Sequence, residues 1–159
     1  MSICLADQEL QLVEVLQRPG FCRGRWTIQS RNAVAQVVKD VAGMMSTHGF
    51  PEQDVFAVRL ALEEALVNAV RHGNVDDPAK IVCIRYFVND SKVTIRIRDE
   101  GSGFNPRAVP DPVAPENLER PSGRGVLLIR KFMSSVRYNR RGNAVTLVKV
   151  RADSLKNGI

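Results

Sequence analysis

The segment RLALEEALVNAVRHGN, residues 59–74, is the stretch from which the fold and the function of this chain are best approached. The stretch from Val55 to Val70, which overlaps this segment, has an apolar helical pattern. Its only polar residues are Arg59, Glu63, Glu64 and Asn68. A helix that is apolar almost all round is normally buried. Burying a carboxylate or an amide without a partner costs several kcal/mol, so each polar residue on this helix needs a reason.

Glu63 and Glu64 differ in the neighbours that the helix gives them. Arg59 lies four residues before Glu63, and an i,i+4 ion pair accounts for Glu63. Glu64 has only Leu60 and Asn68 at the equivalent positions. A carboxylate and an amide oxygen one turn apart suit Mg²⁺ and a proton transfer. The alternative is that both side chains form hydrogen bonds to a neighbouring strand.

The patterns on either side of this segment predict the remaining elements. Ser30 is a predicted N-cap, and Pro19-Gly20, His48-Gly49 and Gly73 end helical stretches. Strands follow from alternating or β-branched runs separated by turn residues. The predicted helices cover residues 5–17, 30–48, 52–71 and 125–134, and the predicted strands cover 21–28, 81–88, 92–98, 135–140 and 144–150.

This order, helices first and then mostly strands, predicts an α+β fold. We expect a single-domain two-layer sandwich in which helices cover one face of a mixed or antiparallel sheet. Polar and apolar residues alternate over residues 92–98, which indicates that one side of this strand is packed and the other faces solvent. Residues 1–20 are interpreted as an N-terminal leader, 21–152 as the domain and 153–159 as a C-terminal tail.

The bulk composition is that of a soluble globular chain. Its 159 residues include 44% hydrophobic and 25% charged residues, and the net charge of +6 favours anionic partners, although a solvated basic face would also explain it. The scattered Cys4, Cys22 and Cys83 suggest a reducing compartment. The chain shows neither a secretory signal nor an apolar run long enough for a membrane span, so we expect a cytoplasmic protein.

Two glycine-containing loops carry further candidate residues. Asp99, Gly101 and Gly103 directly follow a predicted strand, where a half-buried aspartate can accept a hydrogen bond from an exocyclic amine. Gly123, Arg124 and Gly125 open a predicted helix, where free amide groups and the helix dipole favour an anion. Each loop alone is a weak signal. A helix with Glu64 and Asn68, followed along the chain by these two loops, is a combination that rarely arises by chance.

With these motifs the chain resembles the GHKL ATPase superfamily, and residues 59–74 look most like its anti-sigma-factor serine kinases. The resemblance implies that ATP and Mg²⁺ are bound, with Glu64 as general base and Asn68 as the Mg²⁺ ligand. It further implies that Asp99 binds the adenine amino group within a pocket shaped by Gly101 and Gly103. Gly123, Arg124 and Gly125 would contact the phosphates, and residues 104–122 would form a lid.

The resemblance also implies partners. Members of this branch bind a sigma factor, phosphorylate a serine on a small antagonist protein and often form homodimers. Many carry a Gly-Thr-Thr run whose threonine assists adenine binding. Here the corresponding residues are Gly142-Asn143-Ala144, and Asn143 is the candidate substitute.

Two other functions are weighed against the kinase. The first is a non-catalytic ATP-binding module that sequesters a protein partner. The second is nucleic-acid binding through basic residues, which no stacking platform or recognition-helix motif supports. We therefore expect no direct contact with nucleic acid and no membrane association.

Overall fold

The computed structural model describes residues 10–108 and 124–154, which form a two-layer α+β sandwich. The described residues contribute six strands to one sheet in the order β1-β2-β3-β4-β6-β5, and every neighbouring pair is antiparallel. The strands are β1 (Leu10–Arg18), β2 (Phe21–Ile28), β3 (Val82–Asn89), β4 (Lys92–Arg98), β5 (Ser135–Tyr138) and β6 (Ala144–Val150). The predicted fold class is confirmed.

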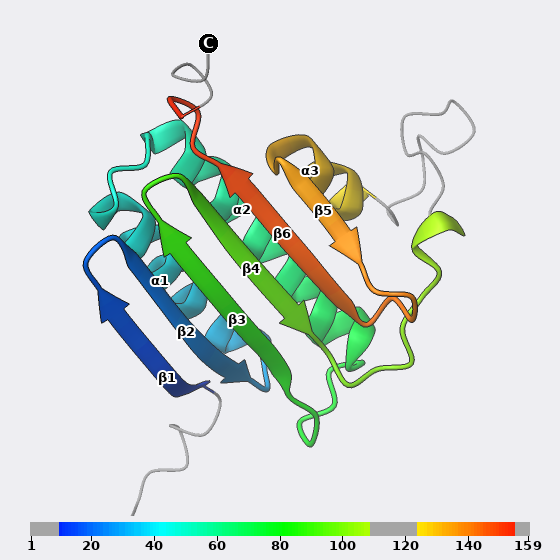
Figure 1. The fold of residues 1–159 in the computed structure, drawn as a ribbon. Helices are drawn as coiled ribbons and strands as arrows, with labels where there is room; N and C mark the ends of the chain where they lie inside the picture. Colours follow the sequence, from blue (N-terminus) through cyan, green and yellow to red (C-terminus); the bar gives the residue numbers. More distant parts are fainter. Residues whose placement is uncertain (1–9, 109–123, 155–159) are drawn as a thin grey trace, which may run out of the picture.

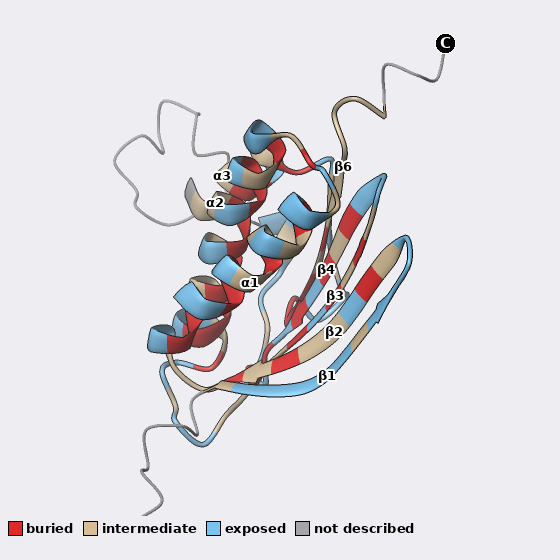
Figure 2. Ribbon diagram, turned by 90° about the vertical axis from the view of Figure 1, so that its left-hand side faces the viewer, coloured by how far each residue is buried: buried red, intermediate tan, exposed pale blue. Residues whose placement is uncertain are grey.

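Helices α1 (Val34–Thr47), α2 (Glu52–Asn68) and α3 (Arg124–Phe132) lie on one face of this sheet (Figures 1 and 2). The core lies between the two layers, because apolar side chains of α1 and α2 meet every second residue of the central strands. Val37, Leu62, Leu66, Ile84 and Ile95 are among the fully buried side chains. Ser30 caps as predicted, but it accepts its hydrogen bond from Asn32 at a short 3₁₀ turn, Arg31–Ala33, that precedes α1.

The prediction of a helix over residues 5–17 is wrong for the residues of this range that the structure describes. Residues 10–18 form β1, the edge strand, which pairs with β2 across the turn at Pro19 and Gly20. Gly20 has a positive φ of 84°, which suits a tight reversal of the chain. The helical spacing of Leu12, Val13 and Leu16 was misleading because a bulge between Leu12 and Glu14 interrupts the strand alternation.

Helix α2 does not continue regularly to Arg71 as expected. After Asn68 the chain widens into a π-helical turn, η3 (Ala69–Gly73), closed by a hydrogen bond from the Asn74 amide to the Ala69 carbonyl at 2.8 Å. Val75 and Asp76 follow with φ near +55°, a strained conformation for residues other than glycine. Such widened turns are frequent at functional sites, and residues of this one line a cavity of about 750 Å³.

Gly24 shows why a glycine is required inside β2. Its partner across the sheet is Tyr86, and a Cβ on Gly24 would lie 2.7 Å from Tyr86 Cε1 and closer still to the hydroxyl. Tyr86 is 3% exposed, and burial raises the pKa of its hydroxyl to about 12. The aromatic ring therefore fills the space that a side chain at position 24 would otherwise take.

Gly24→Ala is accordingly expected to lower the free energy of unfolding by about 1–3 kcal/mol, because the buried ring must move. Gly43→Ala is the matched control: Gly43 is exposed within α1, and a Cβ there meets nothing within 4 Å. That change should raise the free energy of unfolding by about 0.5–1 kcal/mol. Urea unfolding of both variants checks the opposite signs, and equal effects would contradict the role given to Tyr86.

Candidate functional site

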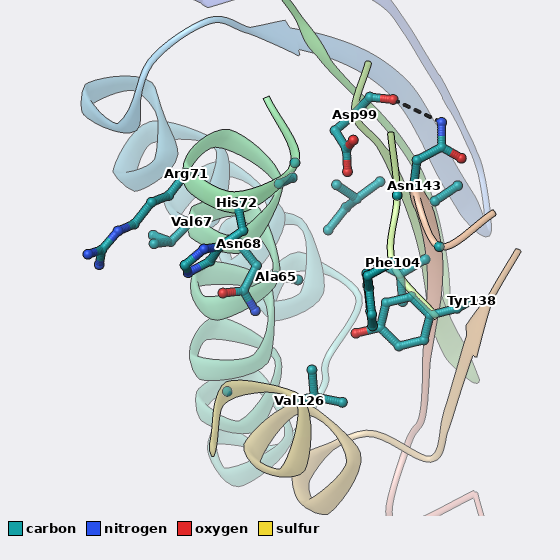
Figure 3. Close-up of a pocket in the computed structure, with 18 of the residues that line it drawn as sticks. Ala65, Val67, Asn68, Arg71, His72, Asp99, Phe104, Val126, Tyr138 and Asn143 are labelled. Carbon is teal, nitrogen blue, oxygen red and sulfur yellow. Dashed lines mark hydrogen bonds between the residues drawn. The ribbon is translucent and has the colours of Figure 1, made fainter. Parts of the chain in front are cut away.

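A cavity of about 750 Å³ lies between the C-terminal half of α2, the start of α3, the loop after β4 and the β5–β6 connection. Its size is within the range of small-molecule sites, about 300–1,000 Å³. Figure 3 shows Asn68 on α2, with Asp99 and Asn143 from the sheet layer on the other side. Segments far apart in sequence therefore meet around one space.

Glycines allow these segments to approach one another closely. A Cβ on Gly73, at the end of the π-helical turn, would lie 2.7 Å from Asp99 Oδ1. One on Gly101 would lie 2.6 Å from the Gly73 carbonyl carbon, and one on Gly103 would lie 2.8 Å from the Arg141 carbonyl carbon. The end of α2, the loop after β4 and the β5–β6 connection are thus packed backbone against backbone, where only glycine fits.

Asp99 is a buried carboxylate at the wall of the cavity. It follows β4 directly and is 9% exposed. Its Oδ1 accepts a hydrogen bond from the Gly101 amide at 2.8 Å. Burial raises the pKa of the Asp99 carboxyl above its usual value, and the Gly101 hydrogen bond offsets part of that rise. Within residues 10–108 and 124–154, Oδ2 accepts no hydrogen bond, so it is available to a donor from a ligand.

Asn143 supports Asp99 from the neighbouring strand connection. The Asp99 amide donates to the Asn143 carbonyl at 3.0 Å, and the Asn143 side-chain amide donates back to the Asp99 carbonyl at 3.4 Å (Figure 3). The Asn143 side-chain oxygen accepts from Asn139 at 2.7 Å. Asn143 lines the cavity and is only 5% exposed. Its side chain fixes the backbone of the loop that carries Asp99.

Glu64 and Asn68 both line the cavity and are both half-buried. Neither side chain forms a hydrogen bond with another described residue, so the alternative in which both side chains bond to a neighbouring strand is not what this part of the chain shows. A Cβ on Gly125 would lie 2.8 Å from the Glu64 carboxyl carbon. The start of α3 therefore reaches the Glu64 carboxylate because position 125 is glycine.

The ion pair expected between Arg59 and Glu63 is absent from the salt bridges of the described residues, and both side chains are exposed. The prediction was wrong because α2 turns this face to solvent, where a carboxylate needs no partner. Glu63 and Glu64 are consecutive, yet only Glu64 reaches the cavity. The helix thus separates the two carboxylates into different environments.

The structure brings together most of the predicted site residues. The cavity is lined by Glu64, Asn68, Asp99, Gly103, Gly125 and Asn143. Gly101 lies beside Asp99 but lines a second, smaller hollow of about 260 Å³. Arg124 begins α3, and Gly123 lies outside the described residues. The expected lid is described only at residues 104–108.

Two residues at the site, Tyr138 and Asn74, were not predicted, and Phe104 was predicted only as the first residue of the lid. Phe104 and Tyr138 line the cavity and form an edge-to-face pair with ring centroids 5.2 Å apart (Figure 3). Asn74, 2% exposed, accepts a hydrogen bond from the Glu100 amide at 2.8 Å and so ties the end of α2 to the loop after β4. The alternation of Val136 and Tyr138 in the predicted strand could have indicated Tyr138, whereas local sequence gives no such signal for Asn74.

The burial of Asp99 predicts a particular pH dependence. Because the pKa of its carboxyl is raised in the folded state, the folded protein binds this proton more tightly than the unfolded chain does. The contribution of Asp99 to stability should therefore fall as pH rises from 3.8 through the raised folded pKa, and then stay constant.

Asp99→Asn keeps the shape and the acceptor for Gly101 but cannot ionise. Relative to the wild type, this variant should gain stability as pH rises from about 4 to 7. Urea unfolding of both proteins across this range measures the difference. A constant difference, or one that shrinks with rising pH, would contradict the desolvation of this carboxylate.

Residues 29–149 match the family model described as the histidine kinase-like ATPase domain. The chain belongs to this family. Its resemblance to the anti-sigma-factor serine-kinase branch is supported by similarity to curated relatives named serine-protein kinase RsbW. The relative from Listeria monocytogenes serotype 4a (strain HCC23) is 26% identical over 116 residues, 69% of this chain and 74% of the relative.

The relative from Staphylococcus aureus (strain JH9) is also 26% identical, over 137 residues that cover 80% of this chain and 86% of that protein. Among solved structures, the RsbU and RsbW domains of a Mycobacterium tuberculosis protein align with a TM-score of 0.49 at 17% identity. That alignment covers 80% of this chain and 32% of the solved one.

In the described part of the chain, no helix is both long and apolar enough to cross a bilayer.

Proposed function

We propose that the chain is a serine-protein kinase that binds Mg-ATP in the cavity and phosphorylates a small antagonist protein within a bacterial regulatory switch. The observation that carries the proposal is that Glu64, Asn68, Asp99 and Gly125 line one cavity. Membership in the ATPase family and the similarity to serine-protein kinases support the same conclusion.

The residues present fit a nucleotide with a magnesium ion. The Oδ2 atom of the buried Asp99, which accepts no hydrogen bond from the described residues, suits the exocyclic amine of adenine, a hydrogen-bond donor. Gly125 lies at the start of α3, packed against the Glu64 carboxylate, and a helix start favours phosphate. Asn68 supplies an amide oxygen, and Mg²⁺ commonly takes few protein ligands together with substrate phosphates.

Each of these side chains has a distinct part in phosphoryl transfer. Asn68 would hold Mg²⁺, which when bound neutralises charge on the phosphates. Glu64, half-buried and without a partner in the described chain, would accept the proton of the incoming serine hydroxyl. Asp99, held by Gly101 and Asn143, would orient the base. Such transfer depends mainly on positioning and electrostatics, which a preformed cavity provides.

The proposed partners are the antagonist protein that carries the serine and a sigma factor, and we expect the protein to act in the cytoplasm. The competing function is a module that binds ATP and sequesters a partner without transferring phosphate. Both functions need the same nucleotide cavity. They differ in whether Glu64 has a hydroxyl group to deprotonate.

The test combines calorimetry and labelled nucleotide. Isothermal titration with ATP, in the presence and absence of Mg²⁺, should show magnesium-dependent binding. Incubation of the protein with γ-labelled ATP and a candidate antagonist protein should then yield phosphoserine. Binding without transfer to any candidate would favour the sequestering module, and no binding of ATP would refute both functions.

A further inference from the structure

The face of the sheet opposite the helices carries a row of arginines that the proposed function does not use. Side chains alternate along a strand. Trp26, Ile84 and Ile95 point to the buried helix side, so their neighbours Arg25, Arg85 and Arg96 point the other way. Figure 2 shows the helices on one side of the sheet only, and no described element covers the other side.

The strand register places these arginines side by side. Arg25 is paired with Arg85, and Arg85 with Arg96. The row continues through Thr146 on β6 to Arg137 on β5. The five strands that carry the row are neighbours in the order β2, β3, β4, β6 and β5 (Figure 1). With strands about 4.8 Å apart, the row from Arg25 to Arg137 spans roughly 19 Å. We call these four arginines the arginine row.

The arginine row is not neutralised within the described chain. None of the salt bridges among the described residues involves it. Glu14 stands opposite Arg25 on β1 yet forms no salt bridge with it. The Arg25 Nε is buried and has no hydrogen-bond partner in this part of the chain. Like charges directly opposite one another destabilise a sheet, so the free protein carries a cost that an anionic partner would remove.

We propose that the arginine row is a docking surface for an acidic helix of a partner protein. A helix that presents one carboxylate per turn repeats about every 5.4 Å, which is close to the spacing of the row. Guanidinium groups bind carboxylates through two parallel hydrogen bonds. The helix would lie across the strands, with its acidic side on Arg25, Arg85, Arg96 and Arg137.

A single-stranded nucleic acid fits this face less well. Such ligands stack their bases on aromatic rings. The aromatic rings on this face, Phe21 and Phe87, are half-buried and stack on each other with centroids 5.5 Å apart. This pairing leaves less ring surface for bases, whereas carboxylates need only the arginines.

The test uses a fluorescent alanine-rich helical peptide of about 20 residues with one glutamate per turn on one side. A peptide with glutamine at the same positions is the control ligand. Fluorescence anisotropy should show that the acidic peptide binds the wild-type protein and that raising the salt concentration weakens binding. The glutamine peptide should bind at least tenfold more weakly.

The triple variant Arg25→Gln/Arg85→Gln/Arg96→Gln should weaken binding of the acidic peptide by at least tenfold. The matched variant Lys39→Gln/Arg59→Gln/Lys131→Gln removes the same charge from exposed positions on the helices and should change it by less than threefold. Thermal unfolding at low salt should show the arginine variant to be as stable as the wild type or more so. If that variant does not fold, Arg85→Gln and Arg96→Gln are compared singly with Arg59→Gln.

Three outcomes would overturn the proposal. The first is that the two triple variants lose affinity for the acidic peptide equally, because net charge alone would then explain binding. The second is that a single-stranded oligonucleotide binds the arginine row while the acidic peptide does not. The third is that neither ligand binds. ATP binding involves other residues, on the helix side of the sheet, so the arginine variant should keep it, and the two proposals can fail independently.

Discussion

Glu64→Ala is expected to abolish detectable phosphoryl transfer to serine while Mg-ATP binding stays within about threefold of the wild type. The carboxylate is the proposed acceptor for the hydroxyl proton, and a positioned base contributes roughly 10²- to 10⁴-fold to a rate. It makes no hydrogen bond within the described residues, so its removal leaves no buried donor unpaired. Labelled-phosphate transfer under single-turnover conditions and calorimetry with ATP measure the two effects separately.

Glu63→Ala is the matched control for this experiment. Glu63 is the adjacent carboxylate on the same helix, but it is exposed and does not line the cavity. Its removal changes the net charge by the same amount and should leave both transfer and binding unchanged. Undiminished transfer by Glu64→Ala, or equal losses in the two variants, would show that Glu64 is not the base.

Asp99→Asn is expected to weaken binding of ATP by roughly 10- to 100-fold without lowering stability at neutral pH. The amide retains the acceptor for Gly101, but it turns an acceptor facing the cavity into a donor. A ligand amine then meets another donor, and an unpaired polar group costs about 1–3 kcal/mol of binding free energy. Because the ionised carboxylate is penalised by burial, the neutral side chain removes that penalty.

Asp54→Asn gives the opposite pattern and is therefore the control. Asp54 is also buried, at 1% exposure, but it lies at the start of α2, where its carboxylate accepts from the Ala152 amide at 2.8 Å and lies 3.8 Å from Lys149 Nζ. Its neutralisation should lower the free energy of unfolding by about 1–2 kcal/mol and leave the affinity for ATP unchanged. Reduced affinity in both variants would indicate a general loss of structure.

The layered fold could be predicted from the sequence because its elements have strong local patterns. The alternation in residues 92–98 predicted β4, and the apolar pattern between Val55 and Val70 predicted the helix α2, although only one face of α2 is buried. The edge strand β1 was missed because its pattern is weak. Most of its side chains are exposed, so burial does not impose a clean alternation, and the bulge at Leu12 and Glu14 shifts the period.

The candidate site was predictable where one segment carries its own polar residues. Glu64 and Asn68 stand out on an apolar helix, and Asp99 stands out after an apolar strand. Contacts between distant segments were not predictable in this way. The hydrogen bond between Asn74 and Glu100, and the approach of Gly73 to Asp99, depend on how α2 ends against β4, which no local pattern encodes.

The widened turn Ala69–Gly73 places a constraint on chain length as well as on side chains. A π turn holds one residue more than a regular helical turn, and each helical residue rotates the chain by about 100°. The additional residue is accommodated within one wide turn, so Asn74 keeps the rotation that directs it at the Glu100 amide. A further residue inserted between Asn68 and Asn74 would exceed what this turn accommodates and would rotate Asn74 by about 100°, away from that amide. An insertion in this short interval would consequently disrupt the wall of the cavity, whereas an insertion in the turn Asp77–Lys80 would leave it in place.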